Sequence, residues 1–126
     1  MKEGKKMNDC IFCKIANKEI PAKVVYEDEI VISYLDINPM HPGHTLIIPK
    51  KHFQDLDDID EETITHIYMT AKKIKKLLEE KLNAKGIKLL QNNGILQEVK
   101  HYHLHIIPDC NVEKLSIDEV FERLTK

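Results

Sequence analysis

The sequence predicts an α+β fold in which one long helix and short terminal helices accompany an antiparallel sheet of about five strands. Apolar runs of strand length follow one another in hairpin order, separated by turn residues. A single amphipathic segment of helix length interrupts them, and the order is not the alternation of strands and helices that βαβ units require. With 126 residues there is room for one core, so we expect a disordered tail at residues 1–8 and a single domain over residues 9–126.

The first half of the chain predicts a short helix and three strands. Pro21 follows the helix and stops it, because proline has no amide hydrogen to continue the helical hydrogen bonds. Asp28 and Glu29 form a tight turn between the first two strands. A loop with two prolines and one glycine, residues 36–43, precedes the third strand, which we expect to end at Pro49. The helix and the strands are expected at residues 10–17, 23–27, 30–35 and 44–48.

The second half predicts the long helix, two strands and a closing helix. Asp60 is placed to cap the long helix, and Glu61 and Glu62 follow in the first turn, where the helix dipole favours acidic side chains. Apolar residues then recur every three or four positions and give the helix one apolar face: Ile64, Ile67, Ala71, Ile74, Leu78 and Leu82. The later elements are expected at residues 87–91, 101–108 and 116–124, with a turn at 92–94 and Ser116 as the last cap.

The last predicted strand carries three histidines, His101, His103 and His105, with apolar residues between them. Successive side chains of a strand point to opposite faces, so the three imidazoles share one face and the residues between them point into the core. On a helix each histidine would lie about 200° from the next, so the middle one would point away from the other two and the three could not converge. We expect Pro108 to end this strand.

Three explanations compete for this row of histidines. The first is a half-exposed strand whose outer face happens to carry histidine, which is the default for one histidine but not for three in register. The second is a metal site, because imidazole is the commonest protein ligand for zinc. The third is nucleophilic catalysis, in which one histidine attacks and its neighbours orient it or bind an anion. The spacing alone does not separate the last two.

Composition excludes several classes of partner. The formal net charge is −2 with mixed signs, which argues against a nucleic-acid-binding surface. There is neither an apolar run long enough to span a membrane nor a signal-type segment, so we expect a cytoplasmic protein with no membrane partner. Disulfides are rare in that compartment, so the pair Cys10-x-x-Cys13 indicates metal or redox chemistry, and Cys110 is interpreted as a plain thiol.

The histidine segment resembles the signature His-φ-His-φ-His-φ-φ, where φ is apolar, of the histidine-triad (HIT) family. Other motifs resemble the Hint and microbial Hit branch of that family, in the family's order from Cys10 to Pro108. They are Cys10-Ile-Phe-Cys13-Lys-Ile, Glu19-Ile-Pro21-Ala-Lys-Val-Val-Tyr-Glu-Asp28, Leu35-Asp36-Ile37-Asn-Pro39, Gly43-His44-Thr-Leu-Ile-Ile-Pro49-Lys-Lys-His52 and Asn92-Asn93-Gly94.

The resemblance implies a nucleotide-binding homodimer whose two sheets join into one, and hydrolysis at the α-phosphate of a purine nucleotide conjugate without a catalytic metal. It implies that His103 is the nucleophile and forms a nucleotidyl-histidine that water cleaves. His105 contacts phosphate oxygens or assists proton transfer, and His44 is a fourth active-site histidine. We therefore expect a hydrolase of nucleoside phosphoramidates. The alternatives are a dinucleoside polyphosphate hydrolase, a nucleotide-binding protein with little turnover, and a metalloenzyme that uses histidine ligands.

The resemblance also assigns the nucleotide site. Asp36 falls at the ribose, and Asn92 at a phosphate or leaving-group oxygen. Gln97 and Glu98 lie in a segment from Gly94 that is about two residues shorter than in the family, and in which Leu96 replaces a glycine. The residues expected to line the base pocket are Phe12, Tyr34 and Ile37.

For the metal, the resemblance completes Cys10 and Cys13 with His52 and His101 as ligands of a structural Zn²⁺. The alternative is that Cys10 and Cys13 are two buried, reduced cysteines. The extra loop histidine, His41, is interpreted as solvated.

Overall fold

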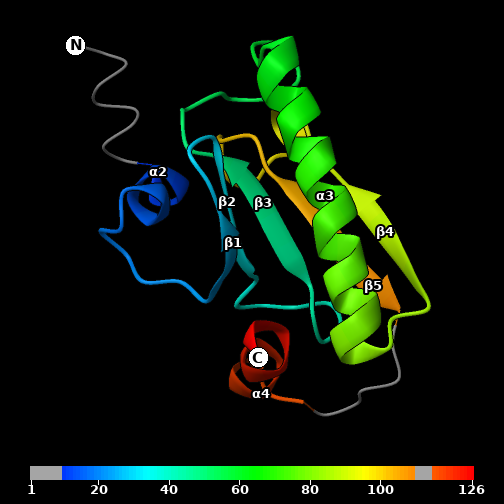
Figure 1. The fold of residues 1–126 in the computed structure, drawn as a ribbon. Coiled ribbons are helices and arrows are strands. Elements are labelled where there is room, and N and C mark those ends of the chain that lie inside the picture. Colours follow the sequence, from blue (N-terminus) through cyan, green and yellow to red (C-terminus); the bar gives the residue numbers. More distant parts are fainter. Residues whose placement is uncertain (1–9, 110–114) are drawn as a thin grey trace.

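The computed structural model describes residues 10–109 and 115–126. The predicted tail at residues 1–8 and Cys110 lie outside these ranges. Five strands form one sheet in the order β1-β2-β3-β5-β4, with every neighbouring pair antiparallel, which confirms the predicted fold (Figure 1). They are β1 (Val24–Glu27), β2 (Val31–Leu35), β3 (Thr45–Pro49), β4 (Gly86–Leu90) and β5 (Leu104–Asp109).

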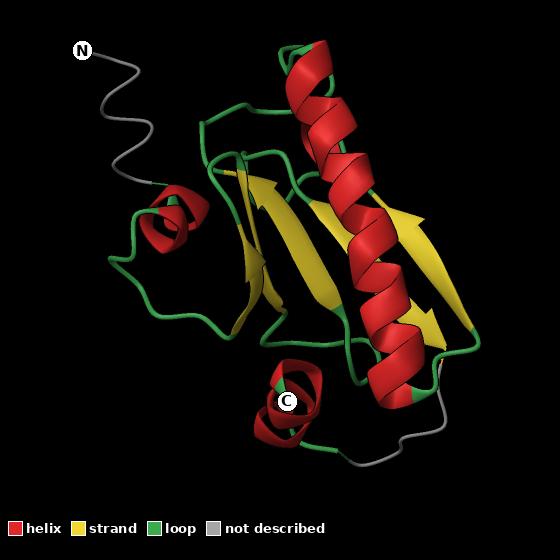
Figure 2. Cartoon of the chain, in the orientation of Figure 1, coloured by secondary structure: helices red, strands yellow, loops and turns green. Residues whose placement is uncertain are grey.

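Three α-helices accompany the sheet in the described ranges: α2 (Ile11–Ala16), α3 (Glu61–Leu82) and α4 (Ile117–Thr125). The long helix α3 runs across one face of the sheet (Figure 2). Most of its predicted apolar face is buried, from Ile67 to Leu82, while Ile64 is partly buried at the edge of the same core. None of these helices is long and apolar enough to cross a membrane.

Both faces of the sheet carry apolar cores, as the weak alternation of its strands indicates. On the α3 face, Val31, Ile47 and Leu104 pack against the helix. On the opposite face, Ile32 and Ile48 pack with residues of the short helix α2. The sheet therefore has one face sealed by a long helix and one face that a short helix covers only in part, which leaves room for a cavity.

The histidine segment differs from the prediction at both ends. Strand β5 begins at Leu104 rather than His101, because its pairing with β3 ends at Ile47, although β3 itself continues beside β2 to Pro49. The preceding residues instead follow the chain after β3, where the Tyr102 amide donates to the Phe53 carbonyl at 2.7 Å. The alternation still holds, since Tyr102 and Leu104 are buried in the core next to α3.

The prediction that Pro108 ends the strand is wrong, because β5 continues to Asp109. Pro108 pairs with Ile87 of β4, but β3 reaches only as far as Ile106 on the other side. Proline is tolerated where it removes no ladder hydrogen bond. At Pro108 the pairing between β3 and β5 has already ended, so the absence of an amide hydrogen removes no hydrogen bond to β3.

Candidate functional site

The ring of His103 is fixed by the chain immediately before it. Its Nδ1 lies 2.7 Å from the carbonyl oxygen of His101, and a carbonyl only accepts, so Nδ1 carries the hydrogen and donates it. The lone pair of a neutral ring is then on Nε2. Phe12 of α2 supports the ring edge-on, with the two ring centroids 4.9 Å apart. His103 is therefore held in one tautomer, with a nucleophilic nitrogen at Nε2.

The surroundings keep His103 neutral. Burial lowers the pKa of its imidazole, and this outweighs the hydrogen bond to the His101 carbonyl and the negative charges of Asp36 and Glu98, which raise the pKa. A neutral imidazole is nucleophilic, whereas imidazolium has no free lone pair. The site thus favours the reactive form of the ring near neutral pH.

A second chain of hydrogen bonds fixes His105. The backbone amide of Met40 donates to Nδ1 of His44 at 3.1 Å, so the hydrogen of a neutral His44 ring lies on Nε2. That Nε2 lies 2.9 Å from Nδ1 of His105 and donates to it. His105 then carries its own hydrogen on Nε2. The loop before β3 thus sets His105 as a hydrogen-bond donor beside the lone pair of His103.

Burial lowers the pKa of both histidines in this chain. The pKa of His105 falls to about 4, mainly through burial and also through the neighbouring His103 and His44 rings. The pKa of His44 is lowered by burial, while Asp36, whose carboxylate lies 3.5 Å from Nε2 of His44, acts in the opposite direction. Two neutral rings can share one hydrogen in this way without electrostatic repulsion.

Asp36, His44 and His105 also lie close enough together to be considered as metal ligands. The hydrogen bonds argue for a different role. The Met40 amide occupies Nδ1 of His44 and places the hydrogen on Nε2, the atom that faces Asp36 and His105. A nitrogen that carries hydrogen cannot ligate a metal. We therefore interpret this cluster as a hydrogen-bond relay.

A cavity of about 360 Å³ opens on the sheet face next to α2. Apolar side chains of α2 and the loop after it form one wall, and the ends of β2 and β5 form the floor. It brings together most of the residues that the sequence assigns to a nucleotide site: Phe12, Tyr34, Asp36, Ile37, Asn92, Glu98, His103 and His105.

Two of the predicted site residues do not line this cavity. His44 is buried, and its Nε2 contacts His105 and Asp36, which line the cavity in its place. Gln97 is buried, and its side-chain amide donates to the carbonyl of Gln54 at 2.6 Å. The side chain of Gln97 therefore anchors its segment to the chain after β3 instead of facing the cavity.

Other lining residues are not assigned by the sequence reasoning. Ile11 and Ile15 of α2, together with Ile20, Pro21 and Ala22, add to the apolar wall. The apolar residues around Phe12 indicate that this helix packs against other parts of the protein. In a helix of only six residues, the sequence does not show which side would contact a ligand. Leu96, which replaces the expected glycine, lines the cavity from a short 3₁₀ turn at Gly94–Leu96.

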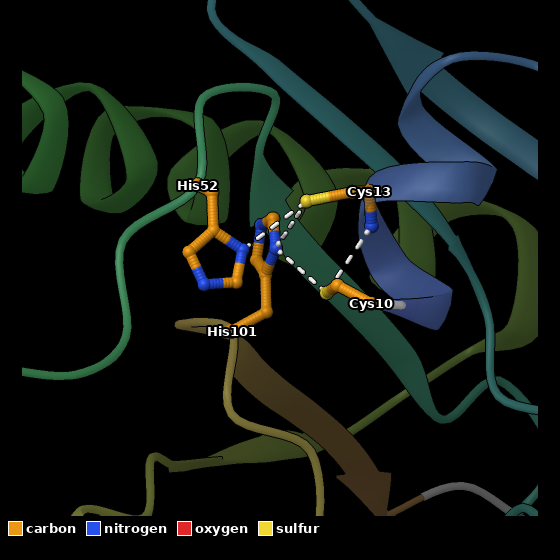
Figure 3. Close-up of side chains that lie close together, drawn as sticks. All are labelled: Cys10, Cys13, His52 and His101. Atoms are coloured by element: carbon orange, nitrogen blue, oxygen red, sulfur yellow. Dashed lines mark hydrogen bonds between the residues drawn. The ribbon is translucent and has the colours of Figure 1, made fainter. Parts of the chain in front are cut away.

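Two cysteines and two histidines lie close together in a second cluster (Figure 3). Nδ1 of His101 lies 3.4 Å from the sulfur of each cysteine, and Nδ1 of His52 lies 3.1 Å from the sulfur of Cys13. Cys10 is the N-cap of α2 and Cys13 lies within α2, while His52 comes from the chain after β3 and His101 from the segment before β5. Three parts of the chain thus meet at one point.

This donor set fits a tetrahedral zinc ion. Bond lengths of about 2.3 Å to sulfur and 2.0 Å to nitrogen separate tetrahedral ligands by about 3.5 Å, close to the observed spacing. The ring of His101 is correctly oriented, because its Nε2 donates to the Pro49 carbonyl at 2.8 Å and leaves Nδ1 for the cluster. Burial lowers the pKa of His101 to about 4, so the ring is neutral, as a ligand must be.

Without a cation, the Cys13 thiol of this cluster favours the protonated form. Burial raises the pKa of Cys13 to about 12, and the hydrogen bond and charge of Cys10 act in the same direction. A divalent cation between the four groups would reverse that preference, because a coordinated thiol loses its proton. Cys10, Cys13, His52 and His101 are therefore the residues that could hold zinc.

One residue, His101, connects this cluster to His103. His101 offers Nδ1 to the cysteines and its carbonyl oxygen to Nδ1 of His103. An interaction that fixes the His101 ring also restrains the position of the His101 carbonyl, which orients the His103 ring. The two sites are thus mechanically connected through a single residue.

The sequence of the chain is similar to a known family model and to known proteins. Residues 17–112 match the family model described as HIT domain. An uncharacterized HIT-like protein of Methanocaldococcus jannaschii is 43% identical over 127 residues, covering 91% of this chain and 98% of the relative. Adenosine 5'-monophosphoramidase HNT1 of Saccharomyces cerevisiae is 45% identical over 101 residues, covering 79% of this chain and 61% of the relative.

A solved structure is similar over almost the whole chain. The crystal structure of a Zn-bound histidine triad family protein from Mycobacterium smegmatis matches with a TM-score of 0.86 and 37% sequence identity. The match covers 94% of this chain and 92% of that one.

Proposed function

The chain belongs to the HIT domain family, and from this premise we propose that it hydrolyses purine nucleoside phosphoramidates at the α-phosphate, through a nucleotide bound covalently to His103. The observation that carries the proposal is the tautomer of His103. Its Nδ1 donates to the His101 carbonyl, so the lone pair lies on Nε2 of a neutral ring that lines the cavity. The adenosine 5'-monophosphoramidase activity in the name of the yeast relative supports the same chemistry.

The reaction has two steps. In the first, Nε2 of His103 attacks the α-phosphorus while the Nε2 hydrogen of His105 donates to a phosphate oxygen. The phosphorus–nitrogen bond of the substrate breaks, and the leaving nitrogen departs as an amine with a proton that solvent supplies. In the second, water attacks the phosphorus, the bond to His103 breaks, and the proton of the water returns to solvent.

The rest of the cavity suits a purine nucleotide. The carboxylate of Asp36 can accept hydrogen bonds from both ribose hydroxyls, and Asn92 can donate to a phosphate or leaving-group oxygen. Phe12, Tyr34 and Ile37 supply apolar surface for a base. Ile37 is 76% exposed, an unusual state for a large apolar side chain, and a bound base would cover it.

Charge favours phosphoramidates over dinucleoside polyphosphates. The lining of the cavity contains Asp36 and Glu98, and among the described residues it contains no lysine or arginine. A polyphosphate chain carries several negative charges and usually needs cations to hold it. A phosphoramidate places only one negative phosphoryl group against neutral histidines. It therefore needs fewer positive charges from the protein.

We also propose a structural zinc ion on Cys10, Cys13, His52 and His101. The sulfur–nitrogen distances and the neutral His101 ring support it. Zinc would fix the His101 ring and so the carbonyl that orients His103. Because zinc thiolates require reduced cysteines, the proposal is consistent with a protein that works in the cytoplasm.

We propose a homodimer in which a second copy pairs along β4. That strand lies at one edge of the sheet, and its Leu89 and Leu90 are 41% and 38% exposed. An unpaired edge with apolar side chains is a ready surface for another strand. Sedimentation velocity on the protein and on a Leu89→Lys variant tests this, and a wild-type monomer at micromolar concentration would contradict it.

The experiment that tests the function is release of AMP from adenosine 5'-phosphoramidate, run beside the variant His103→Ala. Turnover by the wild type that is lost in the folded variant supports the mechanism. Turnover that survives the substitution overturns it. AMP binding without turnover would favour the second candidate, a nucleotide-binding protein, which the short segment Gly94–Glu98 makes a specific alternative.

A further inference from the structure

Glu98 is a charged residue of the cavity to which the mechanism above gives no chemical task. It lines the cavity together with His103 and His105. Its negative charge raises the pKa of His103 against the larger effect of burial, so it lies within electrostatic reach of the nucleophile. Glu98 thus shares the cavity with the two histidines that the proposed function assigns to the phosphate.

A carboxylate in this position is unfavourable for the phosphate of the substrate. Like charges repel unless a cation lies near both of them. None of the ion pairs formed by the described residues involves Glu98. Lys100 is two residues away, but its ammonium group donates to the Gly94 carbonyl at 2.6 Å, and Lys100 does not line the cavity.

The other residues around the phosphate do not supply a cation either. The cavity lining contains no lysine or arginine among the described residues, and burial favours the neutral forms of His103 and His105. Glu98 is exposed to solvent, so it lies at the mouth of the cavity rather than in its floor. A positive charge that compensates both Glu98 and the phosphate would have to enter with the substrate.

We infer that Glu98 selects substrates whose leaving group is an amine that carries a second, protonated amino group, such as a conjugate of a diamine or of a basic amino acid. This inference rests on the proposed phosphoramidate hydrolysis and names its preferred leaving group. One nitrogen of the leaving group is bonded to phosphorus. The other lies two or three bonds further out, as an ammonium group between the phosphate and the Glu98 carboxylate.

The test compares two adenosine 5'-phosphoramidates that differ in one charge. One carries an N-(2-aminoethyl) group and the other an N-propyl group of nearly the same size. Their dissociation constants are measured by calorimetry on the variant His103→Ala, which cannot turn them over. Because an exposed ion pair is worth little, we expect the aminoethyl conjugate to bind about three- to fivefold more tightly.

Two further variants assign the preference to Glu98. In His103→Ala combined with Glu98→Gln, the ratio of the two dissociation constants should fall to about one, and with Glu98→Lys the propyl conjugate should bind better. A matched control, Glu80→Gln, removes an equal charge from an exposed position on α3 and should leave the ratio unchanged. Equal binding of both conjugates without these changes, or a ratio that survives Glu98→Gln, overturns the inference.

The result of this binding comparison can be distinguished from the result of the activity test for the proposed function. Binding to His103→Ala requires no catalysis, so a protein that discriminates the conjugates but does not hydrolyse them would support the inference and contradict the hydrolase. A wild type that hydrolyses both conjugates at equal kcat/KM and binds them equally would support the hydrolase and overturn the inference. Failure of both conjugates to bind overturns the inference as well.

Discussion

At the scale of single residues, backbone groups decide what each histidine of the site can do. The His101 carbonyl puts the hydrogen of His103 on Nδ1, and the Met40 amide puts that of His44 on Nε2. Neighbouring rings of the same residue type therefore present opposite functions, a lone pair at His103 and a donor at His105. Sequence spacing identifies these histidines but carries no information on their tautomers, because the partners are backbone atoms brought close by the fold.

His44 provides a test at this scale, because its Nε2 donates to Nδ1 of His105. The variant His44→Ala removes the donor that fixes the tautomer of His105, and we expect kcat to fall about 100-fold. The dissociation constant for AMP should change little, because His44 does not line the cavity. In His44→Asn the side-chain amide can donate to Nδ1 of His105, and part of kcat should return. Equal loss of binding and kcat, without rescue, would contradict this role.

At the scale of elements, Gly43 joins the loop before β3 to the underside of α3. Its φ is +94°, and a Cβ there would lie 2.7 Å from Cδ1 of Leu82 and 3.1 Å from Cγ of Pro108. A side chain would meet both a strained backbone and a filled core. This residue therefore fixes the position of the loop that carries Met40 and His44.

We expect Gly43→Ala to lower the free energy of unfolding by about 2–4 kcal/mol. Gly86, at the start of β4, is the matched control, because nothing lies within 4 Å of a Cβ built there. Gly86→Ala should change stability by less than about 0.5 kcal/mol. Urea unfolding of both variants measures the difference, and equal midpoints would contradict the packing argument.

The turn between β1 and β2 is held by Asp28. One carboxylate oxygen accepts from the amides of Ile30 and Val31, and the other accepts from the Tyr26 hydroxyl and Nε2 of His66 in α3. Burial opposes ionisation of Asp28, but these hydrogen bonds outweigh it and hold the pKa of the carboxyl well below its usual range. The turn is thus tied to α3 by a negative charge.

This pKa shift predicts a pH dependence of stability. Because the folded pKa is depressed, Asp28 stabilises the fold above its ordinary pKa, and this contribution is lost as pH falls below about 4. We expect Asp28→Asn to cost about 1–3 kcal/mol at pH 7. The difference in urea midpoint between wild type and variant should persist down to about pH 4 and shrink below it. A difference that stays constant to pH 2.5 would contradict the assignment.

The elements themselves were largely predictable from the sequence. Turn residues, apolar periodicity and caps locate all five strands and three helices, and Ser116 caps α4 as predicted. The ends of β5 were not predictable, because they depend on how far β3 runs beside it. Whether Pro108 is tolerated in a strand likewise depends on where a neighbour stops, which sequence periodicity does not contain.

At the scale of the whole molecule, the four proposed zinc ligands link three distant parts of the chain. Their spacing in sequence identifies only the pair Cys10 and Cys13, and the resemblance supplied His52 and His101. The sequence likewise identifies only some of the residues that line the cavity. Most of its polar residues were assigned from motifs in the sequence, whereas Asn38, Ile20 and Leu96 were not assigned and join it through folding.

Removal of zinc tests the link between these parts. Treatment with a chelator should lower the melting temperature by about 10 °C or more, since a structural zinc contributes several kcal/mol to folding. The variant Cys13→Ser should lack stoichiometric zinc and show no such response, whereas His103→Ala should respond like the wild type. Purified protein without zinc by elemental analysis, or a melting temperature unaffected by chelation, would contradict the proposed site.

The proposal that His103 is the nucleophile is tested most directly by the mass of the protein during turnover. We expect that rapid acid-free quenching of wild type with adenosine 5'-phosphoramidate yields protein heavier by one adenylyl group, with the group on the peptide that contains His103. The adduct should be absent from His103→Ala. Turnover without any adduct, or an adduct on another residue, would contradict the assignment of His103 as the nucleophile.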